Sequence, residues 1–390
     1  MLDFTFSNNT KIVFGRGVEE QVGKEAAVWG KKVLLHYGAG HIVRSGLKDR
    51  VVDSLREAGL EIVEFGGAQP NPRLSLVRQG IELARKEQID LILAVGGGST
   101  IDSAKAIGIG VPYDGDVWDF YAGKARPEAS VPVGVVLTIP AAGSESSPSS
   151  VVTNEDGLLK LGCGALVMRP KFALLNPELT FTLPAYQTAC GVADMMAHIM
   201  ERYFTNEEDV GLSDHLCEGA MRSIIQEAPI AIAEPENYGA RANIMWAGTI
   251  AHNDLLGMGR SEDWASHNIE HELSALYDIA HGAGLSIVFP AWMKYVYKKN
   301  PHRFVQFAVR VFGVEQDFHN PERTILEGIR RLEDFFHRIG LPTTLAEAGI
   351  SADRLGEMAE KATAGDTQTL GNFMHLGQRD VLAIYKLTQG

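Results

Sequence analysis

The first 180 residues alternate short β-branched runs with amphipathic stretches, and this alternation constrains the fold more than any other feature of the sequence. Segments with helical periodicity separate the runs KIVFGRG, KKVLLHYG, EIVEFGG and IDLILAVGGG. Residues 91–95, LILAV, are apolar without alternation, as expected for a strand that is buried on both faces. This repeated strand–helix–strand order predicts a parallel sheet with helices on both faces.

The pattern changes after about residue 180. From Pro184 onward helical periodicity dominates, in PAYQTACGVADMMAHIMERYF, YGARANIMWAGTIAHNDLL, WASHNIEHELSALYDIA and ERTILEGIRRLEDFFHRIG. A chain of 390 residues also exceeds what one hydrophobic core usually serves. We therefore predict an α/β domain with a Rossmann-like parallel sheet over residues 1–180 and an all-helical domain over residues 181–390.

Charge and composition limit the partners that such a chain can have. The formal net charge is −13, and the basic residues are scattered, which argues against nucleic acid and anionic membranes as partners. No apolar run approaches the roughly 18 residues of a membrane span, and the opening MLDFTFSNNT lacks a signal-peptide pattern. The cysteines, Cys163, Cys190 and Cys217, are far apart and form no C-x-x-C pair. We expect a cytoplasmic protein without a thiolate zinc site.

A glycine turn, Gly96 to Gly98, lies between a predicted buried strand and a helix in LILAVGGGSTIDSAKAIG. Glycines let a phosphate approach the backbone, and the helix that follows contributes unpaired N–H groups and a positive dipole end. We expect Ser99 to be the helix N-cap, with Asp102 in the capping-box position. The motif is neither G-x-G-x-x-G nor a Walker loop, so a tight turn without a ligand is the alternative.

A second glycine loop follows an earlier predicted strand, in LLHYGAGHIVRSG. Gly38 and Gly40 could admit the other end of a dinucleotide. An NAD-binding loop would place an acidic residue just after this strand, to bind the ribose 2′-hydroxyl. The turn has none, whereas His41 and Arg44 lie close by. This favours a 2′-phosphate, and hence NADP(H) over NAD(H).

A third polar stretch, TIPAAGSESSPSSVVTNEDGLLKLG, follows another predicted strand. We interpret it as a glycine-containing loop that carries Thr138, Ser144, Ser147 and Lys160. Serine-rich loops are common and mostly solvated, so this stretch indicates a cofactor site only beside the other two.

Histidines and a carboxylate recur at helical spacing in the second half. Asp194 and His198 are four residues apart in CGVADMMAHIME and project from one helix face. His267 and His271 repeat the spacing in WASHNIEHEL. His281 follows in IAHGAGLS, whose glycines predict a break between helices.

Such i, i+4 pairs can hold a divalent cation without strain. One carboxylate with three imidazoles would leave open positions on Fe²⁺ or Zn²⁺ for a substrate oxygen. Spacing alone does not show which three of the four histidines would bind the metal. For each histidine, a hydrogen-bonded core residue is the alternative.

These motifs resemble those of the iron-containing (group III) alcohol dehydrogenases. GGGSTIDSAKAIG is similar to that family's G-G-G-S-x-x-D-x-x-K segment, and DMMAHIMERYF and HNIEHELSALYDIAHGAGLSIVFPAWM are similar to its metal-binding segments. The resemblance runs along essentially the whole chain. It is closest to the butanol-dehydrogenase-like, NAD(P)H-dependent aldehyde reductase branch.

The resemblance implies a homodimer, with a dinucleotide-binding domain followed by a dehydroquinate synthase-like helical metal domain in each subunit. Carried over by position, the metal ligands are Asp194, His198, His267 and His281. His271 falls on a position near the nicotinamide and substrate that does not bind the metal. The implied cofactor positions are Gly38, Asn71, Gly97, Gly98, Ser99, Asp102, Thr138 and Lys160.

The chain also departs from the family pattern in its cofactor-facing loops. The family usually reads S-A-T-G-S-E or P-A-T-G-S-E followed by Met-Asn, where this chain reads PAAGSESSPSS. Ala142 therefore stands in place of a threonine, and Ser147 in place of an asparagine. NADP-type members usually end the second glycine loop in serine, where this chain has His41.

Together these features predict reversible hydride transfer between a primary, butanol-like alcohol or its aldehyde and a nicotinamide, with the metal as Lewis acid. His271 could carry the proton to or from the alkoxide, with a structural hydrogen bond as the alternative role. Competing hypotheses are a metal-dependent hydrolase of a phosphorylated substrate, a polyol (glycerol-type) dehydrogenase, and a cofactor-binding sensor without catalysis.

Overall fold

The computed structural model describes residues 1–38 and 40–389, with the side chain of His41 left out. The described chain divides into two compact units. One unit comprises Ser7–Thr182 and contains the sheets. The other comprises residues from Leu183 onward together with Met1–Phe6, and its secondary structure is helical. An α/β unit followed by an all-helical unit is the predicted fold class, although the sequence pattern does not assign the first six residues to the helical unit.

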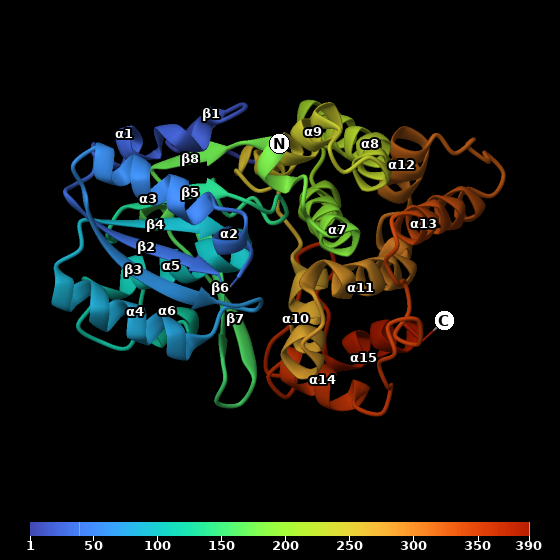
Figure 1. The fold of residues 1–390 in the computed structure, drawn as a ribbon. Coiled ribbons are helices and arrows are strands. Elements are labelled where there is room, and N and C mark those ends of the chain that lie inside the picture. Colours follow the sequence, from blue (N-terminus) through green and yellow to red (C-terminus); the bar gives the residue numbers. More distant parts are fainter. Residues whose placement is uncertain (39, 390) are drawn as a thin grey trace. The chain divides into compact units, whose positions relative to one another are not determined.

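The α/β unit is built on a six-stranded parallel sheet (Figure 1). Its strands, in spatial order, are β1 (Lys11–Phe14), β8 (Phe172–Leu175), β5 (Val133–Leu137), β4 (Leu91–Gly96), β2 (Lys32–Gly38) and β3 (Glu61–Ala68). Every residue of β4 and β5 is buried, which explains their apolar sequences. Gly96 pairs with Leu137 in register, so the chain leaves β4 and β5 at neighbouring points on the carboxyl edge of the sheet.

The helices of this unit are α1 (Val22–Ala26), α2 (His41–Arg44), α3 (Leu47–Glu57), α4 (Leu74–Glu87), α5 (Gly98–Gly110) and α6 (Trp118–Tyr121). Figure 1 shows α3 and α4 on opposite faces of the sheet. α2 and α3 follow each other closely in the sequence but are separate helices. The reason is Gly46, which adopts a left-handed φ of 71° between them and interrupts the helical backbone.

A two-stranded antiparallel sheet follows β5, consisting of β6 (Ser149–Asn154) and β7 (Leu159–Gly164). The prediction of a loop over this stretch is therefore wrong for its second half. Its serine-rich composition conceals a hairpin, in which Gly157 supplies a φ of 84° at the turn. The hairpin is fixed to the neighbouring loop because the Thr153 backbone N–H donates to the Pro72 carbonyl at 2.7 Å.

The helices of the second unit are α7 (Ala185–Tyr203), α8 (Gly211–Ala233), α9 (Tyr238–Ala251), α10 (Ala265–Tyr277), α11 (His281–Val296), α12 (Pro301–Phe312), α13 (Pro321–Arg338), α14 (Leu355–Ala362) and α15 (Gln378–Leu387). α7 packs against α8, α9 and α11. Stacked aromatic rings, among them Phe204 and Phe304, form part of its core. No helix among the described residues is long and apolar enough to cross a membrane.

The break between α10 and α11 comes earlier than the sequence predicts. α10 ends at Tyr277 and α11 already begins at His281, so Gly282 and Gly284 lie inside a helix. Their role is close packing. A Cβ on Gly282 would lie 1.9 Å from the Cys190 carbonyl oxygen of α7, and one on Gly284 would lie 2.3 Å from Glu270 Oε1 of α10. Glycine therefore allows α11 to approach both helices.

Candidate functional site

One face of α7 carries three buried polar side chains, Asp194, His198 and Glu201. Their spacing of four and then three residues places them along the same side of the helix. Glu201 is fully buried, and the other two are at most 6% exposed. Burying polar groups in an apolar core is unfavourable unless they find partners, so this face requires matching groups from neighbouring helices.

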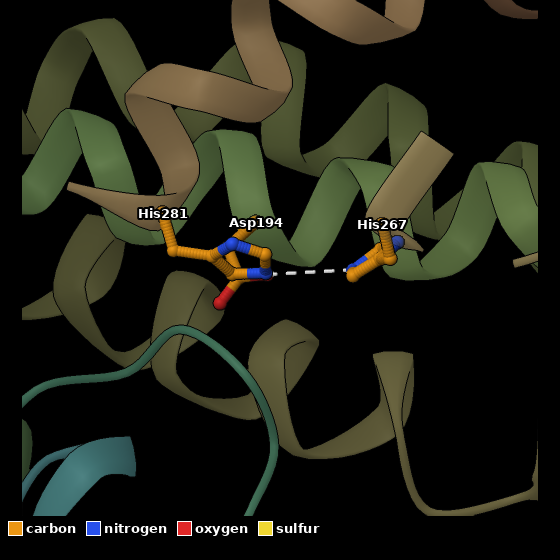
Figure 2. A group of neighbouring side chains, drawn as sticks. All are labelled: Asp194, His267 and His281. Atoms are coloured by element: carbon orange, nitrogen blue, oxygen red, sulfur yellow. Dashed lines mark ion pairs between the residues drawn. The ribbon is translucent and has the colours of Figure 1, made fainter. Parts of the chain in front are cut away.

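The matching groups come from α10 and the start of α11. The Nε2 atoms of His198, His267 and His281 lie 3.3, 3.8 and 3.8 Å from Asp194 Oδ1. Figure 2 shows Asp194, His267 and His281 pointing toward one another. The four residues that the family resemblance assigns as metal ligands, which are separated by up to 87 residues in the sequence, thus come together in the helical unit.

This cluster has the donor set of a divalent-cation site. Asp194 Oδ1 and His267 Nε2 are buried and make no hydrogen bond among the described residues. Leaving such atoms unsatisfied costs about 1–3 kcal/mol each, which a cation between them would offset. Ligand atoms of Asp194, His267 and His281 lie within 4.8 Å of one another. A carboxylate with imidazole nitrogens suits Fe²⁺ or Zn²⁺, so these residues fit the metal that the sequence motifs imply.

Two buried glutamates orient the imidazoles. Glu201 Oε1 accepts a hydrogen bond from His267 Nδ1 at 2.8 Å, and Glu270 accepts one from His281 Nδ1. Both carboxylates are fully buried. A proton held on Nδ1 leaves the lone pair of Nε2 directed at Asp194, as in carboxylate–histidine–metal arrangements.

The motif comparison does not assign Glu201 or Glu270, although the sequence contains a signal for each. Glu201 stands three residues after His198, and Glu270 three residues after His267, so each shares a helix face with an expected ligand. Glu201 also accepts the backbone N–H of Trp264 at 2.7 Å, which ties the start of α10 to α7.

The electrostatics of the cluster favour a positive charge at its centre. Burial lowers the pKa of His267, but the carboxylates of Asp194 and Glu201 outweigh burial and raise its pKa to about 9. Burial lowers the pKa of His198 well below its usual range, and neighbouring histidines such as His252 lower it further. Without a metal, the cluster therefore holds a proton on His267.

His271 lies beside His281. It is largely buried on α10, and its ring centre is 5.6 Å from that of His281. Ligand atoms of Glu270, His271 and His281 also come within 4.8 Å of one another, but the ion pairs of Asp194 are with the other three histidines. The structure thus places His271 beside the cluster.

The glycine turn of the α/β unit lies at the carboxyl edge of the sheet. β4 ends at Gly96, and α5 begins at Gly98. The prediction of Ser99 as N-cap is wrong: Gly97 is the N-cap, no side chain caps this helix end, and Ser99 lies in the first turn. A Cβ on Gly97 would lie 2.9 Å from Ile139 Cβ, so the facing loop leaves room for little more than glycine there.

Other predicted cofactor residues gather at the same edge. Gly38 ends β2, and a Cβ on it would lie 3.8 Å from Thr100 Oγ1 in the first turn of α5. Thr138 directly follows β5, and its N–H donates to the Gly96 carbonyl at 3.0 Å. Gly40 has a φ of 92°.

Further predicted residues of this unit belong to α2, to the loop before α4 and to β7. Arg44 Nη1 lies 2.7 Å from where a Cβ of Gly40 would be, whereas the side chain of His41 lies outside the described part of the chain. Asn71 is buried with a left-handed φ of 54°. Lys160 is buried on β7, opposite Thr153 of β6.

The remaining predicted cofactor residues, Asp102, Ser144 and Ser147, form a network within the protein. Ser144 Oγ donates to Asp102 Oδ1 at 2.6 Å. The Nζ of Lys105 donates to Ser144 Oγ at 2.8 Å and to Ser147 Oγ at 3.1 Å. The motif comparison includes Lys105 only as a letter of the family pattern and gives it no role. Lys105 is fully buried, which the sequence pattern does not predict.

A parallel-sheet unit with glycine turns at its carboxyl edge, and a helical unit with a carboxylate–imidazole cluster, are the parts expected of a dinucleotide- and metal-dependent oxidoreductase. The model for "Iron-containing alcohol dehydrogenase" matches residues 9–177, and that for "Fe-containing alcohol dehydrogenase family, C-terminal" matches residues 188–388. The chain belongs to the iron-containing alcohol dehydrogenase family.

Individual relatives match along nearly the full chain. The chain is 45% identical to the probable NADH-dependent butanol dehydrogenase 1 of Bacillus subtilis, over 99% of both sequences. It is 34% identical to the NADPH-dependent aldehyde reductase YqhD of Escherichia coli, over 95% of both. The solved structure of NADH-dependent butanol dehydrogenase A from Thermotoga maritima matches with a TM-score of 0.97 and 43% identity, over 100% of this chain and 99% of that one.

These matches confirm the predicted family, fold class and enzyme class. The protein is an oxidoreductase that interconverts alcohols and aldehydes, and its family implies a nicotinamide cofactor and an iron-type metal. The hydrolase and sensor hypotheses receive no support from these matches.

Proposed function

We propose that Asp194, His198, His267 and His281 bind one divalent cation, Fe²⁺ or Zn²⁺, at which a primary alcohol and its aldehyde are interconverted. The convergence of three Nε2 atoms on a single buried carboxylate oxygen carries this proposal. A cation held there supplies Lewis-acid polarisation of the substrate oxygen, and the nicotinamide supplies or accepts the hydride.

The protein's own groups prepare this chemistry. Glu201 and Glu270 hold the Nδ1 protons of two imidazoles, which keeps their Nε2 lone pairs directed at Asp194. The start of α5, which has no side-chain cap, offers backbone N–H groups and a dipole end to the pyrophosphate of the cofactor.

We propose His271 as the residue that transfers the proton to or from the alkoxide. Its ring centre lies 5.6 Å from that of His281, beside the carboxylate–imidazole cluster. An imidazole in this position can act as general acid or base without giving up a ligand position.

For the cofactor we propose NADP(H) in preference to NAD(H). Arg44 lies against Gly40 of the second glycine loop, where its guanidinium is available for a 2′-phosphate. Relatives at 45% and 41% identity are named NADH-dependent, which favours the opposite choice, while the NADPH-dependent relative is 34% identical. Kinetics with both nicotinamides decides between them.

For the substrate we propose a primary, butanol-like alcohol and its aldehyde, because several relatives that match over the full chain are named butanol dehydrogenases. A polyol is the second candidate, since a relative at 28% identity is named 1,3-propanediol dehydrogenase.

We further propose a cytoplasmic homodimer without nucleic-acid or membrane partners. The net charge of −13 argues against nucleic acid and anionic membranes as partners. The free cysteines are typical of a reducing compartment such as the cytoplasm. The exposed apolar side chains of Met1, Leu2, Phe4 and Phe6 support a subunit interface. Light scattering coupled to size-exclusion chromatography measures the mass in solution.

The deciding experiment offers butanal with NADPH or NADH to protein reconstituted with Fe²⁺ or with Zn²⁺, and follows loss of the reduced-nicotinamide absorbance. We expect oxidation that requires the added metal and that is absent from the Asp194→Asn variant. No oxidation of either nicotinamide by the metal-loaded protein would refute the proposed reaction. Parallel assays with 1,3-propanediol test the polyol alternative.

A further inference from the structure

Lys105 is a fully buried lysine in the middle of α5. Four oxygens lie within hydrogen-bond distance of its ammonium nitrogen: Ser144 Oγ at 2.8 Å, the Ser147 carbonyl at 3.0 Å, Ser147 Oγ at 3.1 Å and the Ser149 carbonyl at 2.8 Å. A buried ammonium is tolerated only where acceptors replace its hydration, and all four acceptors come from one short segment, residues 144–149. Lys105 therefore fastens this segment to α5.

Asp102 fastens the same segment from one turn earlier on α5. Its Oδ1 accepts from Ser144 Oγ at 2.6 Å, and its Oδ2 accepts from the Val151 backbone N–H at 2.9 Å. Asp102 and Lys105 are three residues apart and so share a helix face. Together they form a clamp, made of these two residues, that holds residues 144–151 at several points.

The clamped segment follows closely on residues 139–142, which face the glycine turn and form its wall. Ile139 Cβ lies 2.9 Å from where a Cβ of Gly97 would be, and Ala142 Cβ lies 3.5 Å from that of Gly98. Residues 139–142 leave β5, which ends at Leu137, and enter the clamp at Ser144. Both ends of this wall are thus anchored, one by the sheet and the other by the clamp.

We propose that Lys105 is a positioning residue for the cofactor: by holding residues 144–149 it sets the gap between the glycine turn and residues 139–142, and thereby the affinity for the nicotinamide dinucleotide. The inference rests on the proposed function of this turn as the pyrophosphate site. Ser144 and Ser147, expected from sequence to contact the cofactor, contribute to its binding through the clamp.

The test uses the full-length protein with Lys105→Met, which keeps the length of the side chain and removes the charge. Lys32→Met is the matched control, because the Nζ of Lys32 pairs with Glu87 in the same unit, outside the glycine turn and the clamp. The dissociation constants of NADPH and NADH are measured by nicotinamide fluorescence, beside the melting temperature, the bound metal and the KM of the aldehyde.

We expect Lys105→Met to raise the dissociation constant and the KM of the nicotinamide at least tenfold, with bound metal and the aldehyde KM within twofold of wild type. Lys32→Met should match wild type in all of these. If Lys105→Met does not fold, Ser144→Ala removes one acceptor of the clamp and should raise the same constant by about threefold to tenfold.

Three outcomes are distinguishable. A folded Lys105→Met protein that binds both nicotinamides as wild type does overturns the inference and leaves the proposed function intact. A lower melting temperature with unchanged nicotinamide affinity assigns Lys105 a purely structural role, which also overturns it. Wild-type protein that binds neither nicotinamide overturns the proposed function, and the inference with it.

Discussion

The carboxylate–imidazole cluster of the helical unit, our candidate metal site, and the glycine turn of the α/β unit are built on opposite principles. In the cluster, chemistry resides in side chains: a carboxylate and three imidazoles converge, and two buried glutamates orient them. At the glycine turn, the candidate binding groups are backbone, and its geometry depends on Ile139, Ala142 and the clamp at Lys105. Substitutions should therefore act directly in the first region and through neighbouring segments in the second.

The substitution with the largest expected effect, His267→Ala, tests whether the cluster binds a metal. His267→Ala removes one converging Nε2, so the protein should lose its metal and at least about 1,000-fold in kcat/KM, equivalent to several kcal/mol of lost polarisation. Metal content by elemental analysis and aldehyde reduction measure the two effects. His302→Ala, at an exposed position on α12, is the control. Retention of a stoichiometric metal by His267→Ala would show that the cluster is not its site.

A second substitution separates the ligands from the neighbouring imidazole. His271→Ala should keep the metal, lower kcat about 100-fold, and remove one ionisation from the pH profile of kcat, because general acid–base catalysis contributes effects of this size. The comparison with His267→Ala is made by metal content on the same preparations. Loss of the metal from His271→Ala would instead place His271 among the ligands.

The third prediction concerns orientation of the ligands. Glu201→Gln keeps the shape of the side chain but weakens its hold on His267 Nδ1, so metal affinity should fall about 10-fold to 100-fold. Competition with a chelator of known affinity measures this change. Glu207→Gln is the control, since Glu207 accepts from Ser261 at a partly exposed position of the same unit. Equal affinities for the two variants would limit Glu201 to a structural role at the start of α10.

The fourth prediction uses the pKa of His267, which is about 9 in the metal-free cluster. Below that pH the imidazole holds a proton that a metal must displace. Apparent metal affinity should therefore rise about tenfold per pH unit between pH 7 and pH 9 and level off above it. The same linkage means that protonated His267 stabilises the metal-free protein below about pH 6.5, an effect lost as the pH rises through 9.

Chelator competition at several pH values measures this slope. A flat profile from pH 7 to pH 9 would mean that no ligand carries a proton in the metal-free state.

The smallest effects are expected at the glycine turn. Gly97→Ala would place a Cβ 2.9 Å from Ile139 Cβ, so the facing wall must move, at a cost of roughly 1–2 kcal/mol in unfolding free energy. In Gly98→Ala the new Cβ would lie 3.5 Å from Ala142 Cβ, an ordinary van der Waals contact. This substitution should change the free energy of unfolding by less than about 1 kcal/mol. Urea unfolding of both variants gives the difference. Equal stabilities would show that the wall moves freely, contrary to its anchoring by the clamp.

Much of this molecule follows from local sequence patterns. The apolar run of β4 and its glycines predict a buried strand with a turn at its end, because burial on both faces and a tight exit each leave a local signature. The i, i+4 pairs on α7 and α10 likewise follow from helical geometry. Family resemblance, and not spacing, distinguishes His271 from the expected ligands.

Other features are not visible in the sequence pattern. The β6–β7 hairpin is hidden in a serine-rich stretch, because its alternation is mostly polar. Gly282 and Gly284 resemble helix breakers, although they serve close packing against Cys190 and Glu270, which lie on other helices. Ser99 resembles an N-cap, but the N-cap of α5 is Gly97, and Ser99 lies in the first turn of the helix.

The sequence by itself determines the two-part architecture, the glycine turn and the residue types of the metal cluster, because these depend on hydrophobic period and on spacing within single elements. Only the tertiary structure decides which atoms converge on Asp194, which carboxylates orient the imidazoles, and that Lys105 is buried among loop oxygens. The physical reason is distance along the chain. Contacts between α7 and α10, or between α5 and residues 144–149, arise from packing of separate elements, and no local period encodes that packing.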